Sequence, residues 1–159
     1  MIHCPSQVAP QQLSRDHLGW RRLLLVGQGI AQTPFALRVD RLAVFVGGCT
    51  IEAIEAVCYQ AGESPSNLLD ALTALIDKSL LRQTEGLDEA PCFTMLEIIR
   101  AYALEQLNVS GETRELKRRH MAYYLALAET AAPEITGPHQ QVWLDRLEQN
   151  HDNVQAALQ

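Results

Sequence analysis

The amino-acid sequence predicts a mainly α-helical fold: a winged helix-turn-helix with a short β-hairpin, followed by antiparallel helices of a helical-repeat type. Two observations carry this prediction. Three segments with apolar residues at helical spacing precede two short strand-like segments, which is the order of elements in a winged helix. Further helical segments then follow in series, and antiparallel helix pairs in series are how helical-repeat proteins begin.

The chain of 159 residues divides into three parts. Residues 1–34 form a poorly assigned N-terminal segment. We expect a winged-helix domain over residues 35–109 and the beginning of a helical-repeat region, truncated by the end of the chain, over residues 112–159. In the first part, LLLVGQGI looks like a strand entering a phosphate-binding loop. Gln32 stands where a dinucleotide fingerprint has its third glycine, so we expect no nucleotide site there.

The first two helices of the winged helix are expected on either side of a glycine pair. Apolar residues from Phe35 to Val46 predict a buried helix that ends at Gly47-Gly48, because glycine commonly follows a helix C-terminus. Thr50 stands where the N-cap of the second helix belongs. That helix has a single apolar stripe, which consists of Ile51, Ile54, Val57 and Cys58.

A third helix, a hairpin and a fourth helix complete this part. After the turn AGESPSN, the third helix carries apolar residues at helical spacing, namely Leu69, Leu72, Leu75, Ile76 and Leu80. SLLRQT and CFTML have the composition of two strands, joined by the polar loop EGLDEAP. The segment LEIIRAYALEQL is then an amphipathic helix with an inward stripe of Leu96, Ile99, Ala103 and Leu107.

The remainder of the chain is expected to be helical after a break at Ser110-Gly111. Two helices are predicted over residues 112–132 and 138–149, separated by Pro133 and by Gly137-Pro138. The residues NHDN then supply N-cap candidates for a last helix, VQAALQ.

Charge argues against a nucleic-acid partner. Between Arg41 and Val109, ten acidic residues stand against four basic ones, a net charge of −6, while the rest of the chain balances at nine against nine. The helix that would enter a major groove carries Asp70 and Asp77 against Lys78, and the hairpin loop is acidic as well. Because an acidic surface repels the phosphate backbone, we expect that this module binds no nucleic acid.

The sequence predicts a protein that is not an enzyme and has no catalytic, cofactor or metal site. It contains neither a Gly-x-Ser-x-Gly elbow nor a His-Glu-x-x-His motif. No Cys-x-x-Cys pair occurs, so buried thiols are expected at the four cysteines, which are Cys4, Cys49, Cys58 and Cys92. No apolar run approaches the ~20 residues that span a bilayer, and no secretory signal opens the chain. We therefore expect a cytoplasmic protein without a membrane partner.

Two pairs of charged residues are candidates for contact with another domain. Asp77 and Lys78 end the third helix, and Glu97 and Arg100 lie at the start of the fourth. A solvated helix end and an i,i+3 ion pair remain the plainer alternatives. The basic cluster Lys117-Arg118-Arg119-His120 is expected to be a solvated helix face, because acidic residues lie near it in the sequence.

Long ordered segments resemble one family. RLAVFVGGCTIEAIEAVC, LLDALTALIDKSLL, FTMLEIIRAYALEQL, RRHMAYYLALAE and WLDRLEQNHDNVQAAL follow one another within residues 41–158. Together they resemble the region after the nucleotide-binding domain of bacterial STAND-type signal-transduction ATPases. Such proteins are often described as LuxR-family or SARP-like transcriptional regulators, or as predicted ATPases.

This resemblance implies a role inside a larger protein. In the family, a winged helix connects an ATPase domain to a tetratricopeptide-like superhelix that senses a ligand or partner. The implied function is a non-catalytic regulatory module that relays conformational state, with the nucleotide-binding domain and the repeat region as its partners. The winged-helix histidine that contacts nucleotide in such proteins has no counterpart between Arg41 and Val109. The alternative is a stand-alone DNA-binding winged-helix regulator. The sequence assigns no effector, target gene or oligomeric state.

Overall fold

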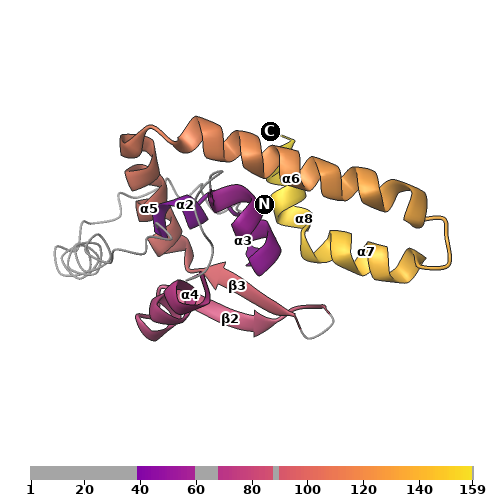
Figure 1. The fold of residues 1–159 in the computed structure, drawn as a ribbon, viewed down its shortest axis with the longest axis horizontal. Coiled ribbons are helices and arrows are strands. Elements are labelled where there is room, and N and C mark those ends of the chain that lie inside the picture. The colour runs from indigo at the N-terminus through magenta and orange to yellow at the C-terminus, as the bar shows by residue number, and fades with distance from the viewer. Residues whose placement is uncertain (1–38, 60–67, 88–89, 159) are drawn as a thin grey trace, which may run out of the picture.

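The computed structural model describes residues 39–59, 68–87 and 90–158. Its helices and strands in chain order are α2 (Val39–Leu42), β1 (Gly48–Thr50), α3 (Ile51–Cys58), α4 (Leu68–Asp77), β2 (Leu81–Glu85), β3 (Pro91–Met95), α5 (Glu97–Ser110), α6 (Thr113–Glu134), α7 (Gln140–Gln149) and α8 (His151–Ala157). In Figure 1, α3 lies between α6 at the top and the β2–β3 hairpin at the bottom. The expectations for residues 1–34, for the start of the first helix and for the turn AGESPSN lie outside the described residues.

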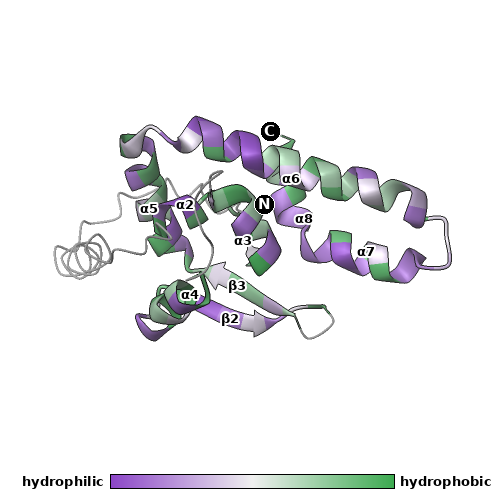
Figure 2. Cartoon of the chain, viewed as in Figure 1, coloured by the Kyte–Doolittle hydropathy of each residue, from purple (hydrophilic) through white to green (hydrophobic). Residues whose placement is uncertain are grey.

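This architecture confirms the predicted fold class. The chain is mainly helical, and its small antiparallel sheet has the strand order β1-β3-β2. The β2–β3 hairpin is the predicted wing, with Gln83 opposite Phe93 at its centre. Figure 2 shows β2 mostly hydrophilic and β3 more hydrophobic, in agreement with β2 as the exposed edge strand. No helix within the described ranges is long and apolar enough to cross a membrane.

Strand β1 is a feature that the sequence pattern does not predict. It pairs antiparallel with β3, with Cys49 opposite Phe93. Gly47 has a φ of +80°, a left-handed conformation that glycine adopts without steric cost, and it turns the chain into the strand. A Cβ on Gly48 would lie 2.5 Å from Sγ of Cys92, so the absence of a side chain at Gly48 leaves room for the Cys92 side chain.

The first helix ends earlier than the sequence predicts. Helix α2 ends at Leu42, whereas the apolar pattern continues to Val46. The next backbone N–H groups donate to carbonyls three residues earlier, as in the 3.2 Å bond from Phe45 N to Leu42 O. The chain has to leave the helix here because Gly48 already pairs with β3. Ala43, Val44 and Phe45, which follow the helix, are nonetheless buried in the core.

Helices α3 and α4 form the helix-turn-helix. Thr50 caps α3 as predicted, since its Oγ1 accepts a 3.4 Å hydrogen bond from Ala53 N. The buried stripe of α4 consists of Leu68, Leu72 and Leu75. Leu69 was assigned to this stripe wrongly: it is 63% exposed, because Leu68 takes the inward position one residue earlier. Leu80 is buried, but it lies beyond the helix, after a turn in which Ser79 has a φ of 58°.

Helix α5 buries Ile99, Ala103 and Leu107 as predicted. Leu96 was expected in the same stripe, but its side chain is 36% exposed. It occupies the N-cap with an extended backbone, so it does not share the helical phase of the residues that follow. Gly111, at a φ of 77°, ends the helix in the left-handed conformation typical of a C-cap glycine.

Helix α6 packs on α3 and α5 of the winged helix, and α7 and α8 pack against α6. Figure 1 shows the long α6 above α8 and α7. Leu116 and Tyr124 of α6 belong to the same buried cluster as residues of α3, α4 and α5. The helices before and after Gly111 therefore share one hydrophobic core.

Candidate functional site

Helix α4 and strand β2 of the wing contact each other, and we call the outer side of α4 together with the exposed residues of β2 the α4–wing face. Opposite its buried stripe, α4 exposes Leu69, Asp70, Thr73, Ala74 and Asp77, and Lys78 follows directly. The exposed side chains of β2 are Arg82, Gln83, Thr84 and Glu85. In a helix-turn-helix, the second helix of the motif is the one that enters a major groove. The α4–wing face is therefore the candidate nucleic-acid interface.

The chemistry of this face is mixed. Lys78 and Arg82 can neutralise phosphates, and Gln83 can form hydrogen bonds to base edges or to phosphate oxygens. Asp70 and Asp77 oppose the approach of phosphate. The Thr73 hydroxyl donates to Leu69 O at 2.8 Å, so its hydrogen is already used within the helix.

The predicted interdomain residues lie in two places. Asp77 and Lys78 are exposed at the end of α4 and form no ion pair with any residue in the described ranges. Glu97 and Arg100 lie in the first turns of α5 and form a 3.2 Å ion pair. Arg100 also donates from Nε to Phe45 O at 2.8 Å, so one end of this pair holds the backbone before β1. Whether these residues contact another domain stays a prediction.

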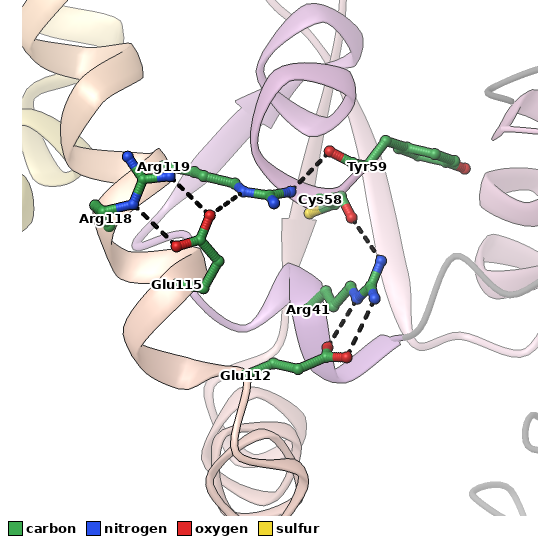
Figure 3. Close-up of polar contacts among 7 residues, drawn as sticks. All are labelled: Arg41, Cys58, Tyr59, Glu112, Glu115, Arg118 and Arg119. Atoms are coloured by element: carbon green, nitrogen blue, oxygen red, sulfur yellow. Dashed lines mark hydrogen bonds and ion pairs between the residues drawn. The ribbon is translucent and has the colours of Figure 1, made fainter. Parts of the chain in front are cut away.

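The basic cluster on α6 was predicted as a solvated face, and this holds for only half of it. Lys117 and Arg118 are exposed, whereas Arg119 donates to Tyr59 O at 2.9 Å and His120 is 3% exposed. Figure 3 shows Glu115 between the two arginines. Hydrogen bonds from Arg118 and Arg119 lower the pKa of Glu115 to about 2. Arg119 and His120 follow the buried Leu116 by three and four residues, so they lie on the same side of α6 and face α3 rather than solvent.

Arg41 forms the second polar contact in Figure 3. Its side chain is 8% exposed, and its Nε lies 3.0 Å from Oε2 of Glu112. A second bond joins Nη2 to Oε1 of Glu112 at 3.3 Å, and Nη1 donates to Cys58 O at 2.8 Å. One arginine thereby connects α2, the end of α3 and the residue that precedes α6.

A buried group of polar atoms, which we call the polar joint, connects α8 to the strand side of the winged helix. It consists of the side chains of Asn153 and His120 with the backbone of Val46 and Gly48. Asn153 is 1% exposed; its Oδ1 accepts from Val46 N at 2.8 Å, and its Nδ2 donates to Gly48 O at 2.7 Å. The Nε2 atom of His120 lies 3.2 Å from the same Oδ1.

His120 is held in its neutral form in this joint. Burial lowers its pKa, Arg100 adds to the effect, and the hydrogen bond to Asn153 opposes it. Because Asn153 Oδ1 is an acceptor, the neutral ring carries its proton on Nε2. Phe45 and Tyr124 pack against the ring, with centroids 5.5 Å and 4.7 Å away.

Three cysteines are buried in the same region, as predicted for Cys49, Cys58 and Cys92; Cys4 lies outside the described residues. Burial raises the pKa of all three thiols, to about 12 for Cys58. The part of the chain that the structure describes contains no cluster of His, Cys, Asp and Glu that could hold a metal ion.

The polar joint and the Arg41–Glu112 pair are not predicted by the sequence pattern. Asn153 was considered only as part of an N-cap for the last helix, and its hydrogen-bond partner Val46 lies 107 residues away in the sequence. The one available signal was a polar residue within an otherwise apolar helix face, beside Val154 and Ala157. That signal alone does not identify the residues that bond to Asn153.

Comparisons with known proteins agree with this geometry. Residues 38–108 match the family model of a winged helix-turn-helix domain. The chain is 37% identical over 151 residues to proteins named "Putative HTH-type transcriptional regulator" in Mycobacterium tuberculosis and Mycobacterium bovis. That similarity covers 95% of this chain but 16% of each relative, so the chain spans about one sixth of their length. No solved structure matches the chain.

These similarities overturn the expectation that the module binds no nucleic acid. A winged helix-turn-helix match and relatives named as transcriptional regulators point to DNA as a partner. The charge count was an incomplete guide, because neutral side chains and backbone N–H groups also bind phosphates. Base edges are likewise read in part by uncharged amide and hydroxyl groups, which carry no weight in a net charge.

Proposed function

We propose that this chain is the winged-helix part of a transcriptional regulator and that its α4–wing face contacts DNA. The observation that carries the proposal is the winged helix-turn-helix match over residues 38–108. The names of the longer mycobacterial relatives support it. In this function α4 enters the major groove and the wing lies along the neighbouring backbone. The role is non-catalytic.

The exposure of the α4–wing face supports this assignment. A recognition helix has to present a free row of side chains, and α4 buries only its opposite stripe. Arg82 and Gln83 point to solvent from β2 and supply a phosphate-binding cation and a neutral donor. The acidic residues of α4 reduce the attraction for phosphates, so we expect modest affinity with few charge contacts.

A salt titration of DNA binding tests the proposal. The full chain is titrated into a labelled random duplex, and fluorescence anisotropy is followed at several salt concentrations, starting from about 50 mM. With Lys78 and Arg82 as the phosphate contacts, the slope of log K against log salt should be about −2. Arg82→Ala should reduce that slope by about 1.

Arg114→Ala is the matched control for this titration. Arg114 is an exposed arginine at the start of α6. In Figure 1 the start of α6 lies at the top left and the wing at the bottom. Its removal changes the net charge equally but should leave the slope unchanged. Absence of salt-dependent binding in the wild-type chain, or an equal effect of both variants, would contradict the proposed interface.

A second candidate function is the relay of conformational state within a larger ATPase-containing regulator. Two observations favour it: the resemblance of residues 41–158 to the region after the nucleotide-binding domain of STAND-type ATPases, and the polar joint that connects the winged helix to α6 and α8. In this role the repeat helices are tetratricopeptide-like, and Asp77, Lys78, Glu97 and Arg100 contact the nucleotide-binding domain.

Cross-linking tests this second candidate. Lys78→Cys and Glu97→Cys place thiols at exposed positions of the predicted contact. In a protein that carries both the winged helix and a nucleotide-binding domain, these thiols should cross-link to that domain, whereas Lys117→Cys on α6 should not. Equal cross-linking from all three positions would rule out a specific contact.

A further inference from the structure

The turn between α7 and α8 touches the small sheet at two places. We call residues 149–153 the α7–α8 corner. Gln149 ends α7 and lies at the turn of the wing, whereas Asn153 in α8 lies at β1. The wing is therefore in contact with helices that are not part of the winged helix-turn-helix.

The first contact involves the wing turn itself. This turn is closed by a 2.8 Å hydrogen bond from Gly86 N to Ala90 O. A Cβ on Gly86 would lie 2.5 Å from Nε2 of Gln149, which shows that the Gln149 amide rests directly on the backbone of the turn. Only a glycine leaves room for this approach.

The second contact holds the opposite edge of the sheet. Asn153 bonds to both Val46 N and Gly48 O, on either side of Gly47. A Cβ on Gly47 would lie 3.1 Å from Oδ2 of Asp152, so the corner also packs closely on this turn. Since β1 pairs with β3 and β3 with β2, a restraint on β1 is transmitted to the wing through the strand ladder.

We propose that the α7–α8 corner positions the wing, with Gln149 and Asn153 as its positioning residues. The consequence for DNA rests on the proposed function: the orientation of the wing on the duplex depends on where the C-terminal helices lie. The corner supports the wing rather than covering it, because the side chains from Arg82 to Glu85 stay exposed.

Support from the α7–α8 corner matters because the wing is only weakly stabilised by its own strands. A two-stranded hairpin is marginally stable by itself, and β2 is an edge strand with one buried residue, Leu81. An unsupported wing would lose conformational freedom on binding, and that loss weakens affinity. A wing already fixed by Gln149 avoids this cost.

Hydrogen exchange on the full chain tests the proposal. In Gln149→Ala, backbone amides within residues 81–87 and 90–95 should exchange about fivefold faster, because local opening of the hairpin becomes easier. Amides of α4 and α5 should keep their wild-type rates, and the melting temperature should change little. Gln155→Ala, which truncates an exposed glutamine of α8, is the matched control and should leave the wing unaffected.

DNA affinity, measured by the same anisotropy titration, provides the functional readout. Gln149→Ala should weaken binding about threefold with an unchanged salt slope, since no phosphate contact is lost. Faster wing exchange in a chain that does not bind DNA would support the positioning role and contradict the proposed function. Unchanged wing exchange in Gln149→Ala, or the same change in Gln155→Ala, would overturn the positioning role whatever the DNA result.

Discussion

The α4–wing face and the polar joint are built on opposite principles. The face is exposed and combines Lys78 and Arg82 with acidic residues that form no ion pair among the described residues. The joint is buried, and each polar atom of Asn153 has a partner. Polar groups at the surface exchange water for a partner at little cost, whereas buried ones are expensive to leave unpaired. Stability should therefore depend on the joint and binding on the face.

The largest expected effect on stability comes from removal of the Asn153 side chain. In Asn153→Ala, the N–H of Val46 and the carbonyl of Gly48 lose their partner at a partly buried site, and the buried His120 loses its acceptor. We expect the free energy of unfolding to fall by about 3 kcal/mol or more. Urea unfolding followed by circular dichroism measures it. Asn108→Ala, at an exposed site on α5, serves as the control, and equal midpoints for the two variants would refute the role of the joint.

The next largest effect on stability is expected from breaking the partly buried Arg41–Glu112 ion pair, and the exposed Arg118–Glu115 pair serves as the comparison. Arg41→Met removes a nearly buried guanidinium from Glu112 and from Cys58 O, which should cost about 2 to 4 kcal/mol. Arg118→Met breaks a pair whose side chains are 64% and 44% exposed, and the loss of stability should be much smaller than for Arg41→Met because solvent screens the exposed pair. The same urea measurement applies to both. Similar losses of unfolding free energy in the two variants would mean that burial does not determine how much each ion pair contributes to stability.

The pH dependence of stability is a smaller effect of the joint. The pKa of His120 is lowered from about 6.5 in the folded chain, so below that pH the unfolded chain binds more protons. The contribution of neutral His120 is fully present above about pH 6.5 and is lost progressively as the pH falls from there toward the folded-state pKa.

Urea midpoints at about pH 8 and about pH 5 measure this dependence. His120→Gln keeps a donor for Asn153 but removes the titration, so its midpoint should change less with pH. His151→Gln alters an exposed histidine and should behave as the wild type does. A wild-type dependence retained in full by His120→Gln would assign it to another group.

The smallest effect on stability is expected at the α4–wing face. Asp77 is exposed and forms no ion pair with a described residue, so Asp77→Asn should change the free energy of unfolding by less than about 0.5 kcal/mol. The same change should raise DNA affinity severalfold at low salt, because one repulsive charge leaves the interface. Glu129→Gln removes the same charge from α6 and should leave affinity unaltered. A large loss of stability in Asp77→Asn would mean that the face has a structural role.

Local patterns predict the part of this fold that depends on local interactions. The stripes of α3 and α5, the Thr50 cap and the β2–β3 hairpin follow from helical spacing, capping chemistry and strand composition. Strand β1 is not predicted by the sequence because its three residues, one of them glycine, show no alternation of apolar and polar side chains. Its strand conformation comes from pairing with β3, more than forty residues away.

The site was less predictable because its contacts join distant residues. Arg41 and Glu112 are separated by 71 positions, and no pattern along the chain connects them. His120 was grouped with its charged neighbours, although the structure places it with Phe45 and Tyr124. The helix and the hairpin of the α4–wing face were predicted and are present in the structure, but net charge alone led to the wrong conclusion that the module binds no nucleic acid.

The rates at which the buried thiols react report how fast the parts of the molecule around them open. Cys49, Cys58 and Cys92 lie on β1, α3 and β3, respectively. Thiolates are the reactive form, and burial keeps these thiols protonated and covered. A soluble alkylating reagent can therefore modify each one only at the rate at which its own element separates from the core. The order in which the three are labelled gives the order in which the winged helix comes apart.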